Sequence, residues 1–476
     1  MNLPQAFVER TRRLLGEEYS LFEASLQQET PVSIRPNRGK YLQPIDGEPI
    51  PWASSGVYLK TRPTFTFDPL FHAGCYYVQE ASSMFVERVL SHYVKDPVTM
   101  LDLCAAPGGK STLCRSALPE GSLLVANEVM RNRSQILAEN LIKWGHPDVI
   151  VTNNDPADFT SLTNLFDVVL TDVPCSGEGM FRKDEVAVEE WSVDNVDVCW
   201  QRQRRILKDI WPALKPGGIL IYSTCTFNCE EDEDNVAWIA KELGAEILPV
   251  PVEADWGITG NLVGEDFPVY RFLPRHTKGE GFFLSVLRKR HFTDDKASLY
   301  EAESVALRTP SRKAKKGKDH KGKQAPLPIP KEAKSWLESA DDFVLEMKDA
   351  TLMAFPKAHA ETCALLQTCL KVIHAGITLG ELKGKDLIPH HSLAMSISKA
   401  DKAFPTFELT YHQAIAYLRK EGLVLDASAP RGYVLVTYRE IPLGFVKNIG
   451  NRANNLYPQE WRIRSGYMPE EVVCVG

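Results

Sequence analysis

Between residues 98 and 290, short apolar runs alternate with segments in which apolar residues recur at helical spacing. The apolar runs lie at 98–103, 122–127, 148–152, 166–172 and 217–224. Helical spacing is clearest over 132–144, 196–214 and 230–243. This alternation of strands and helices predicts an α/β fold, a doubly wound and mainly parallel sheet with helices on both faces.

The last apolar run of this region, 282–287, follows the run at 245–248 without a helical pattern between them. We therefore expect these two strands to lie antiparallel at the edge of the sheet, which makes the sheet mixed.

The flanking segments have different patterns. Residues 1–90 combine helical periodicity over 6–26 with short alternating stretches at 31–37, 57–59 and 64–67, and predict a small α+β domain. Residues 336–476 mix helical and strand patterns, and a pair of strands is predicted at 432–438 and 442–447. The sequence thus predicts two further globular parts around a central domain at 91–290.

Residues 291–335 have the composition of a linker. A basic run occupies 312–318, and prolines follow at 326, 328 and 330. Two interpretations remain open, a solvated tether and a weak arm that contacts phosphates.

Composition limits the class of protein. The chain has 476 residues, 44% hydrophobic and 25% charged, with a formal charge of −7. It contains no apolar run long enough to span a bilayer and no secretory signal at its start, and its ten cysteines lack the spacing of a disulfide framework. We expect a cytoplasmic protein that binds neither membrane nor metal. A nucleic-acid partner would need local basic patches.

The stretch 101–110, LDLCAAPGGK, predicts a buried strand that enters a glycine turn and then a helix. Two glycine positions of a dinucleotide fingerprint hold alanine and proline, which disfavours NAD and leaves the adenosine of S-adenosylmethionine as a better ligand. Glu128 follows Gly109 by about 20 residues, where a ribose hydroxyl would meet a carboxylate. An ordinary strand–helix turn is the alternative.

Further polar side chains follow the next strands. Asp155 is expected to accept a hydrogen bond from an adenine amino group, and Asp172 to lie near both cofactor and substrate, because ligands bind beyond the carboxyl ends of parallel strands. Cys175 and Cys225 follow two adjacent strands, where a positive sulfur would favour a thiolate nucleophile. A buried, apolar role is the alternative for each thiol. Cys225 and Cys229 lack a matching pair for a metal site.

Four segments together resemble the Sun/Fmu-type RNA cytosine methyltransferases, most firmly over residues 1–290: LDLCAAPGGKST (101–112), TDVPCSGEGMFRKD (171–184), YSTCTFNCEEDEDNV (222–236) and RFLPRHTKGEGFF (271–283). The resemblance implies a Rossmann-like class I methyltransferase domain, S-adenosyl-L-methionine as cofactor, and a C-terminal RNA-binding region similar to PUA domains. It implies formation of 5-methylcytosine, in small-subunit (16S) ribosomal RNA. Val173 departs from the proline that many relatives carry there.

The resemblance also implies roles for individual residues. Cys225 is the expected nucleophile, Cys175 is expected to assist product release, and Asp172 and Lys110 complete the catalytic set, although Lys110 has an equally plausible structural role. The residues expected to line the cofactor are Cys104, Ala105, Ala106, Pro107, Gly108, Gly109, Lys110, Glu128, Arg133, Asp155 and Asp172.

Basic residues of the flanking parts are hypothesised to hold the RNA backbone: Arg35, Arg38, Lys40, Lys447 and Arg452, with ordinary surface charge as the alternative for each. The sequence leaves open whether the substrate is ribosomal or transfer RNA. Another alternative, an inactive RNA-binding assembly factor, would not need both thiols.

Overall fold

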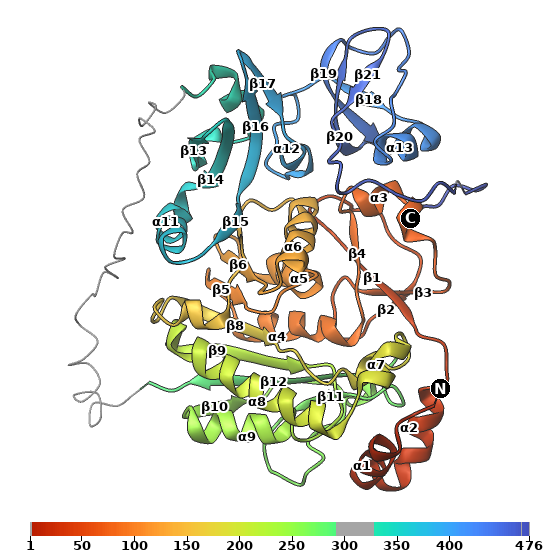
Figure 1. The fold of residues 1–476 in the computed structure, drawn as a ribbon, viewed down its shortest axis with the longest axis vertical. Coiled ribbons are helices and arrows are strands. Elements are labelled where there is room, and N and C mark those ends of the chain that lie inside the picture. Colours follow the sequence, from red (N-terminus) through yellow and green to blue (C-terminus); the bar gives the residue numbers. More distant parts are fainter. Residues whose placement is uncertain (1, 292–327, 468, 476) are drawn as a thin grey trace, which may run out of the picture.

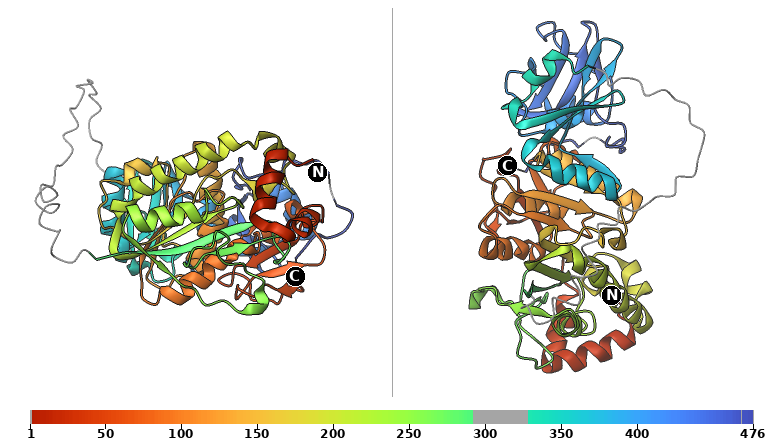
Figure 2. Two further views of the ribbon diagram at one scale, coloured as in Figure 1. Left: turned by 90° about the horizontal axis from the view of Figure 1, so that it is seen from below. Right: turned by 90° about the vertical axis from the view of Figure 1, so that its left-hand side faces the viewer.

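The computed structural model describes residues 2–291, 328–467 and 469–475, so the basic run at 312–318 lies outside the described residues. The molecule is elongated. The N-terminal helices α1 (Gln5–Leu15) and α2 (Tyr19–Ser25) lie at one end of its long axis, and the C-terminal sheets lie at the other (Figures 1 and 2).

The central sheet has the order β10-β12-β9-β8-β5-β6-β7-β15. Strands β9, β8, β5, β6 and β7 run parallel, while β10, β12 and β15 are each antiparallel to a neighbour. The strands are β5 (Thr99–Asp102), β6 (Leu123–Asn127), β7 (Val149–Thr152), β8 (Phe166–Asp172), β9 (Leu214–Thr224), β10 (Ala245–Leu248), β12 (Phe282–Lys289) and β15 (Val372–Ala375), and β11 (Tyr270–Phe272) pairs with β12. The predicted mixed, doubly wound sheet is confirmed.

Helices cover both faces of this sheet because each has one apolar side. One face packs against Val86, Leu113 and Leu137 of α4 (Phe85–Tyr93), α5 (Gly109–Ala117) and α6 (Arg131–Trp144). The other face packs against α8 (Val193–Ile210), α9 (Glu233–Glu242) and α11 (Ala360–Cys369). The short helix α7 (Glu185–Glu190) precedes α8.

The strand β15 is an addition that the sequence did not predict. It belongs to the C-terminal part of the chain, yet it pairs with β7 through Val372 and Thr152 and so completes the central sheet. The rest of that part forms two four-stranded sheets, β13-β14-β16-β17 and β18-β19-β20-β21. Their elements are β13 (Phe343–Lys348), β14 (Thr351–Pro356), β16 (Ile377–Lys383), β17 (Asp386–Pro389), α12 (His391–Met395), β18 (Thr406–Glu408), α13 (Tyr411–Leu418), β19 (Gly432–Tyr438), β20 (Ile441–Asn448) and β21 (Ala453–Asn455).

The N-terminal part shares a core with the C-terminal part. Its sheet has the order β2-β3-β1-β4, from β1 (Val32–Pro36), β2 (Glu48–Pro49), β3 (Val57–Leu59) and β4 (Tyr76–Val78), and α3 (Pro69–His72) precedes β4. Side chains such as Ile34 and Leu70 pack with Ile415 of α13 and Val434 of β19. The N-terminal sheet and α3 therefore meet the C-terminal part beside the central domain, whereas α1 and α2 pack at the other end of the molecule.

Three sequence predictions are corrected. The helix expected over 6–26 is interrupted at Gly16, which has a φ of +58°. The strand expected at 64–67 is a 3₁₀ turn (Phe65–Phe67), which still buries both phenylalanines. The helix expected over 196–214 ends at Ile210 because Pro212 lacks the amide that a helix needs, and Leu214 already belongs to β9.

Candidate active site

The two cysteines of interest lie where adjacent parallel strands end. Asp172 at the end of β8 pairs with Ser223 near the end of β9, so the loops that follow them start side by side. The Sγ atoms of Cys175 and Cys225 are 3.2 Å apart, and the amide of Cys225 is 3.4 Å from the sulfur of Cys175. The thiols thus face each other at the edge of the sheet where ligands are expected.

The environment of Cys175 favours the protonated form of its thiol. The hydrogen bond with Cys225, together with burial, raises the pKa of Cys175 well above its usual range. Cys175 therefore keeps its proton at neutral pH and is available as a hydrogen-bond donor to the sulfur of Cys225.

Asp172 connects this pair of thiols to the glycine turn. One of its carboxylate oxygens lies 2.9 Å from the ammonium of Lys110, and the other accepts a hydrogen bond of 2.8 Å from the hydroxyl of Ser223. Burial would lower the pKa of Lys110, but Asp172 outweighs that effect and raises it, so Lys110 stays charged. The ammonium also lies 5.2 Å from the ring centre of Phe282. Ser223 is a residue of this site that the sequence analysis did not select.

The glycine turn has the geometry that its sequence predicts. Gly108 has a φ of +116°, and α5 begins at Gly109, where an added Cβ would lie 3.2 Å from the ring of Tyr77. The peptide bond between Ala106 and Pro107 is cis. The carbonyl of Ala106 accepts a hydrogen bond from the side chain of Arg133, and that of Pro107 from Asn140.

The end of β6, the neighbour of β5 in the sheet, supplies a carboxylate and an apolar surface. The side chain of Glu128 is 4% exposed, accepts the amide of Met130 at 2.8 Å and lies 3.5 Å from the guanidinium of Arg133. A carboxylate offers about four acceptor positions, so lone pairs remain for the hydroxyls of a ribose. Val129 and Met130 are 50% and 58% exposed, and they offer an apolar surface to an adenine ring.

Asp155 lies at the end of the neighbouring strand β7, as expected, but it already has partners. It caps a 3₁₀ turn by accepting the amide of Ala157 at 3.0 Å, and the guanidinium of Arg205 lies 3.5 Å away. Its role toward adenine stays a prediction. Cys104 follows β5, which lies between β8 and β6 in the sheet, and its side chain is half-buried. Burial raises the pKa of its thiol, so this thiol keeps its proton at neutral pH.

Several supporting residues of the cofactor side escaped the sequence analysis. The amide nitrogen of Asn127 donates to the carbonyls of Leu103 and Asn154, so it joins three strand ends. The side chain of Asn153 donates to the carbonyls of Glu128 and Val129. It is held in turn by Lys371, whose ammonium lies 2.8 Å from its side-chain oxygen.

Two residues expected on an RNA-binding surface direct their charged groups to partners within the protein. Arg35 is buried, so the hypothesis is wrong for it, whereas Lys40 is half-buried and its contact with RNA stays a prediction. Arg35 is 1% exposed, donates to Thr112 of α5 at 2.6 Å and stacks on Trp144. The ammonium of Lys40 donates to the carbonyl of Lys143 at 2.6 Å, and burial lowers its pKa to about 8.

The remaining three residues of that hypothesis are distributed differently. Arg38 and Arg452 are exposed, whereas Lys447 is half-buried and lies 3.5 Å from Asp386. Their contact with RNA stays a prediction.

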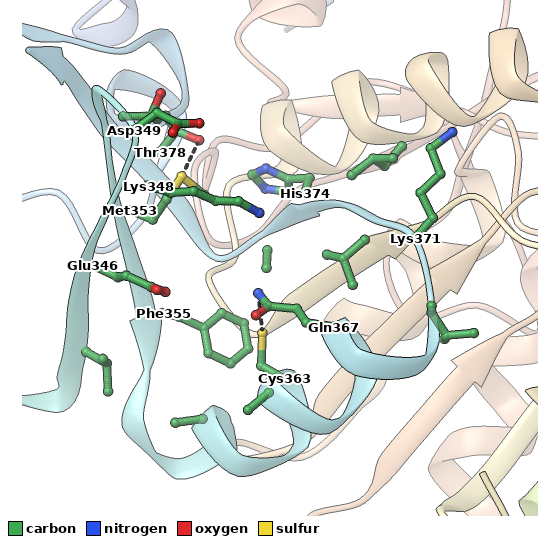
Figure 3. A pocket seen from close by; sticks show the side chains of 18 of the residues that line it. Glu346, Lys348, Asp349, Met353, Phe355, Cys363, Gln367, Lys371, His374 and Thr378 are labelled. Carbon is green, nitrogen blue, oxygen red and sulfur yellow. Dashed lines mark hydrogen bonds between the residues drawn. The ribbon is translucent and has the colours of Figure 1, made fainter. Parts of the chain in front are cut away.

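A separate cavity of about 960 Å³ lies between β13–β14 and α11–β15, and neither Cys175 nor Cys225 lines it (Figure 3). Its lining combines charged and neutral side chains, among them Glu346, Lys348, Gln367 and His374. Burial lowers the pKa of His374 to about 4, so this histidine is neutral. None of the residues expected to bind cofactor or substrate lines this cavity.

The described ranges contain no group of three or more histidine, cysteine, aspartate or glutamate side chains placed to ligate a metal ion. No helix among these residues has the length and apolar character that crossing a membrane requires.

Comparison with known proteins places the chain in a family. Residues 91–288 match a family model described as 16S rRNA methyltransferase RsmB/F. Residues 3–81 match the N-terminal domain of 16S rRNA methyltransferase RsmF, and residues 404–463 match the methyltransferase RsmF PUA domain. The PUA-like region expected toward the C-terminus is thereby confirmed.

Individual relatives agree with the family models. The ribosomal RNA small subunit methyltransferase F of Serratia proteamaculans is 30% identical over 98% of each chain, and that of Citrobacter koseri is 31% identical over 87% of this chain and 84% of its own. The solved structure of a methyltransferase homolog protein from Pyrococcus horikoshii is 28% identical and covers 60% of this chain and 95% of its own, with a TM-score of 0.52. The chain therefore belongs to the family of the ribosomal RNA small subunit methyltransferases F, within the RsmB/F group of 16S rRNA methyltransferases.

Proposed function

We propose that this RNA methyltransferase forms 5-methylcytosine in small-subunit ribosomal RNA through a covalent bond between Cys225 and the target cytosine. The observation that carries the proposal is the pair of thiols 3.2 Å apart at the strand ends, beside the Asp172–Lys110 ion pair. The names of the curated relatives support the ribosomal substrate.

S-adenosylmethionine is the cofactor of this family, and the donor set beside the glycine turn fits it. The buried Glu128 suits ribose hydroxyls, and the exposed Val129 and Met130 suit adenine. When bound, the cofactor supplies a methyl group attached to a positively charged sulfur.

Carbon 5 of cytosine is a poor nucleophile, so the ring has to be activated first. In the proposed reaction the thiolate of Cys225 adds to carbon 6, which makes the ring enamine-like and carbon 5 able to take the methyl group. Asp172 accepts a hydrogen bond from the exocyclic amino group, and the ammonium of Lys110 beside it stabilises the negative charge that develops on the ring.

Release of the product reverses the addition. Carbon 5 gives up its proton to a water molecule, the electron pair of that C–H bond forms the double bond between carbons 5 and 6, and the bond to the sulfur of Cys225 breaks, which returns Cys225 to its thiolate. Cys175, which keeps its proton at neutral pH, hydrogen-bonds the departing sulfur and assists this elimination.

Replacement of Cys175 by serine tests the covalent route. We expect Cys175→Ser to accumulate a protein–RNA adduct, because addition at Cys225 proceeds while elimination is slowed. A denaturing gel run under turnover conditions should show a shifted band that contains RNA. The matched control is the double variant Cys175→Ser/Cys225→Ser, which should give no such band; a band in the double variant, or none in the single variant, would contradict the assignment.

An experiment in cells tests which modified base is formed and which kind of RNA carries it. Bisulfite sequencing of ribosomal and transfer RNA, with and without the gene for this chain, should reveal a 5-methylcytosine that is lost from small-subunit ribosomal RNA. Loss of the modified base from transfer RNA instead would agree with the proposed methylation of cytosine but contradict the proposal that ribosomal RNA is the substrate.

A further inference from the structure

Two buried glutamates join the loops that carry the two cysteines. Glu178 belongs to the Cys175 loop, yet its carboxylate accepts the backbone amides of Phe227 and Asn228, at 2.7 and 3.1 Å, in the loop that follows Cys225. The neighbouring amide of Gly179 donates to the carbonyl of Cys225 itself at 2.8 Å. The Cys175 loop therefore holds the backbone on which the other thiol is mounted.

The second glutamate makes the reverse connection. Glu231 belongs to the segment after Cys225, and both of its oxygens lie near the backbone amide of Ser176, at 3.2 and 3.1 Å. It also accepts a hydrogen bond of 2.6 Å from the side chain of Gln203 on α8. Each cysteine loop thus supplies a carboxylate that binds main-chain donors next to the opposite cysteine.

One asparagine links the two carboxylates. The side-chain nitrogen of Asn228 lies 3.2 Å from Glu178 and 2.9 Å from Glu231. Beside it, the hydroxyls of Ser176 and Thr226 are 2.9 Å apart, so the residues that follow the two cysteines are paired in the same way as the thiols. We call Glu178, Asn228 and Glu231 the loop brace.

The loop brace is unfavourable for the stability of the fold, because it buries carboxylates without a cation beside them in the described part of the chain. Both glutamates are buried, and within the described ranges neither carboxylate makes an ion pair. Burial raises the pKa of Glu231 to about 7, which reports the penalty for charging it there. A buried carboxylate without a cation is retained more readily where it fixes a specific geometry than where it only adds stability, and the geometry fixed here is the approach of the two thiols.

We propose that Glu178 and Glu231 are positioning residues that set the distance between Cys175 and Cys225, so that the adduct on one sulfur is resolved by the thiol of the other. This inference rests on the proposed function for its catalytic consequence. The distance itself can be measured without RNA or cofactor.

Phenylarsine oxide provides that measurement, because one trivalent arsenic bonds to two thiols that lie close together and releases one water. We expect the wild-type protein to bind it at Cys175 and Cys225, located by peptide mass spectrometry, and Cys175→Ser to lose that site. Glu178→Ala and Glu231→Ala should bind at least about tenfold more weakly, because their thiols are no longer held together. Leu366→Ala, a buried position on α11, is the control for loss of stability and should bind as the wild type does.

The kinetic consequence separates positioning from general destabilisation. Each glutamate variant should lower kcat and increase the fraction of enzyme trapped as RNA adduct, and the KM for RNA should fall with kcat because release is slowed. The affinity for S-adenosylhomocysteine should stay unchanged. The double variant Glu178→Ala/Glu231→Ala should have a kcat only slightly below that of the slower single variant, because the two carboxylates maintain the same distance between the thiols.

The outcomes are distinct. Wild-type arsenical binding and a wild-type adduct fraction in both glutamate variants would overturn the loop brace as a positioning device. Weaker arsenical binding in the glutamate variants, together with no RNA adduct in Cys175→Ser, would support the thiol geometry and reject the proposed covalent function.

Discussion

The two halves of the active site are held in different ways. The cysteine half, at the ends of β8 and β9, is supported by side chains from the same two loops that carry the thiols, such as Glu178 and Glu231. The cofactor half, at the ends of β5, β6 and β7, is supported from distant parts of the chain. Arg35 of the N-terminal part reaches α5, and Lys371, next to β15, reaches Asn153. The cysteine half is thus supported locally, whereas the expected cofactor half receives contacts from the N-terminal and C-terminal parts of the chain.

The substitution with the largest expected effect disrupts the cysteine half of the site alone. Cys225→Ser should lower turnover by more than about a thousandfold, because a hydroxyl is a far weaker nucleophile than a thiolate. Calorimetric affinity for S-adenosylhomocysteine should stay within about twofold of wild type, since Cys225 follows β9 and most of the expected cofactor residues follow β5 to β7. Near-normal turnover in this variant would remove Cys225 as the nucleophile, and a large loss of affinity would mean that the halves are not independent.

The same contrast explains what the sequence could predict. The strands and the positions of Cys175 and Cys225 follow from apolar runs that end in polar loops, because parallel strands bring such ends to one edge. The loop brace was missed, although its glutamates lie inside the same segments, because only the fold decides which buried amides a carboxylate meets.

The cofactor half was predicted less completely for a physical reason. Its motif residues are local and were found, but Lys371 lies more than 200 positions from Asn153, and no periodicity in either segment relates them. Arg35 was assigned to a surface because a charged residue is usually exposed; its burial depends on Trp144 and Thr112, which come from other elements.

A substitution with a smaller expected effect disrupts the cofactor half of the site. Glu128→Ala should weaken binding of S-adenosylhomocysteine by about 10- to 100-fold, since it removes a buried acceptor of charge-assisted hydrogen bonds. Glu120→Ala is the control, because Glu120 is exposed and lies at the start of the same strand–helix unit, away from the strand end. The adduct fraction at saturating cofactor should remain that of the wild type. Unchanged affinity by calorimetry would refute the ribose role of Glu128.

The smallest expected effect tests whether the C-terminal part supports the cofactor half. Lys371→Ala removes the ammonium that holds Asn153, and Asn153 in turn donates to the carbonyls of Glu128 and Val129. The backbone amide of Lys371 still donates to Asn154, so the strand end is loosened rather than lost. We expect affinity for S-adenosylhomocysteine to fall about two- to fivefold, the order of one exposed hydrogen bond, with adduct formation at saturating cofactor unchanged. Lys348→Ala, which removes a charge from the lining of the neighbouring cavity of Figure 3, should leave affinity as it is. Equal losses in the two variants would indicate a general electrostatic effect of the C-terminal part, and no loss in either would leave the cofactor half as locally supported as the cysteine half.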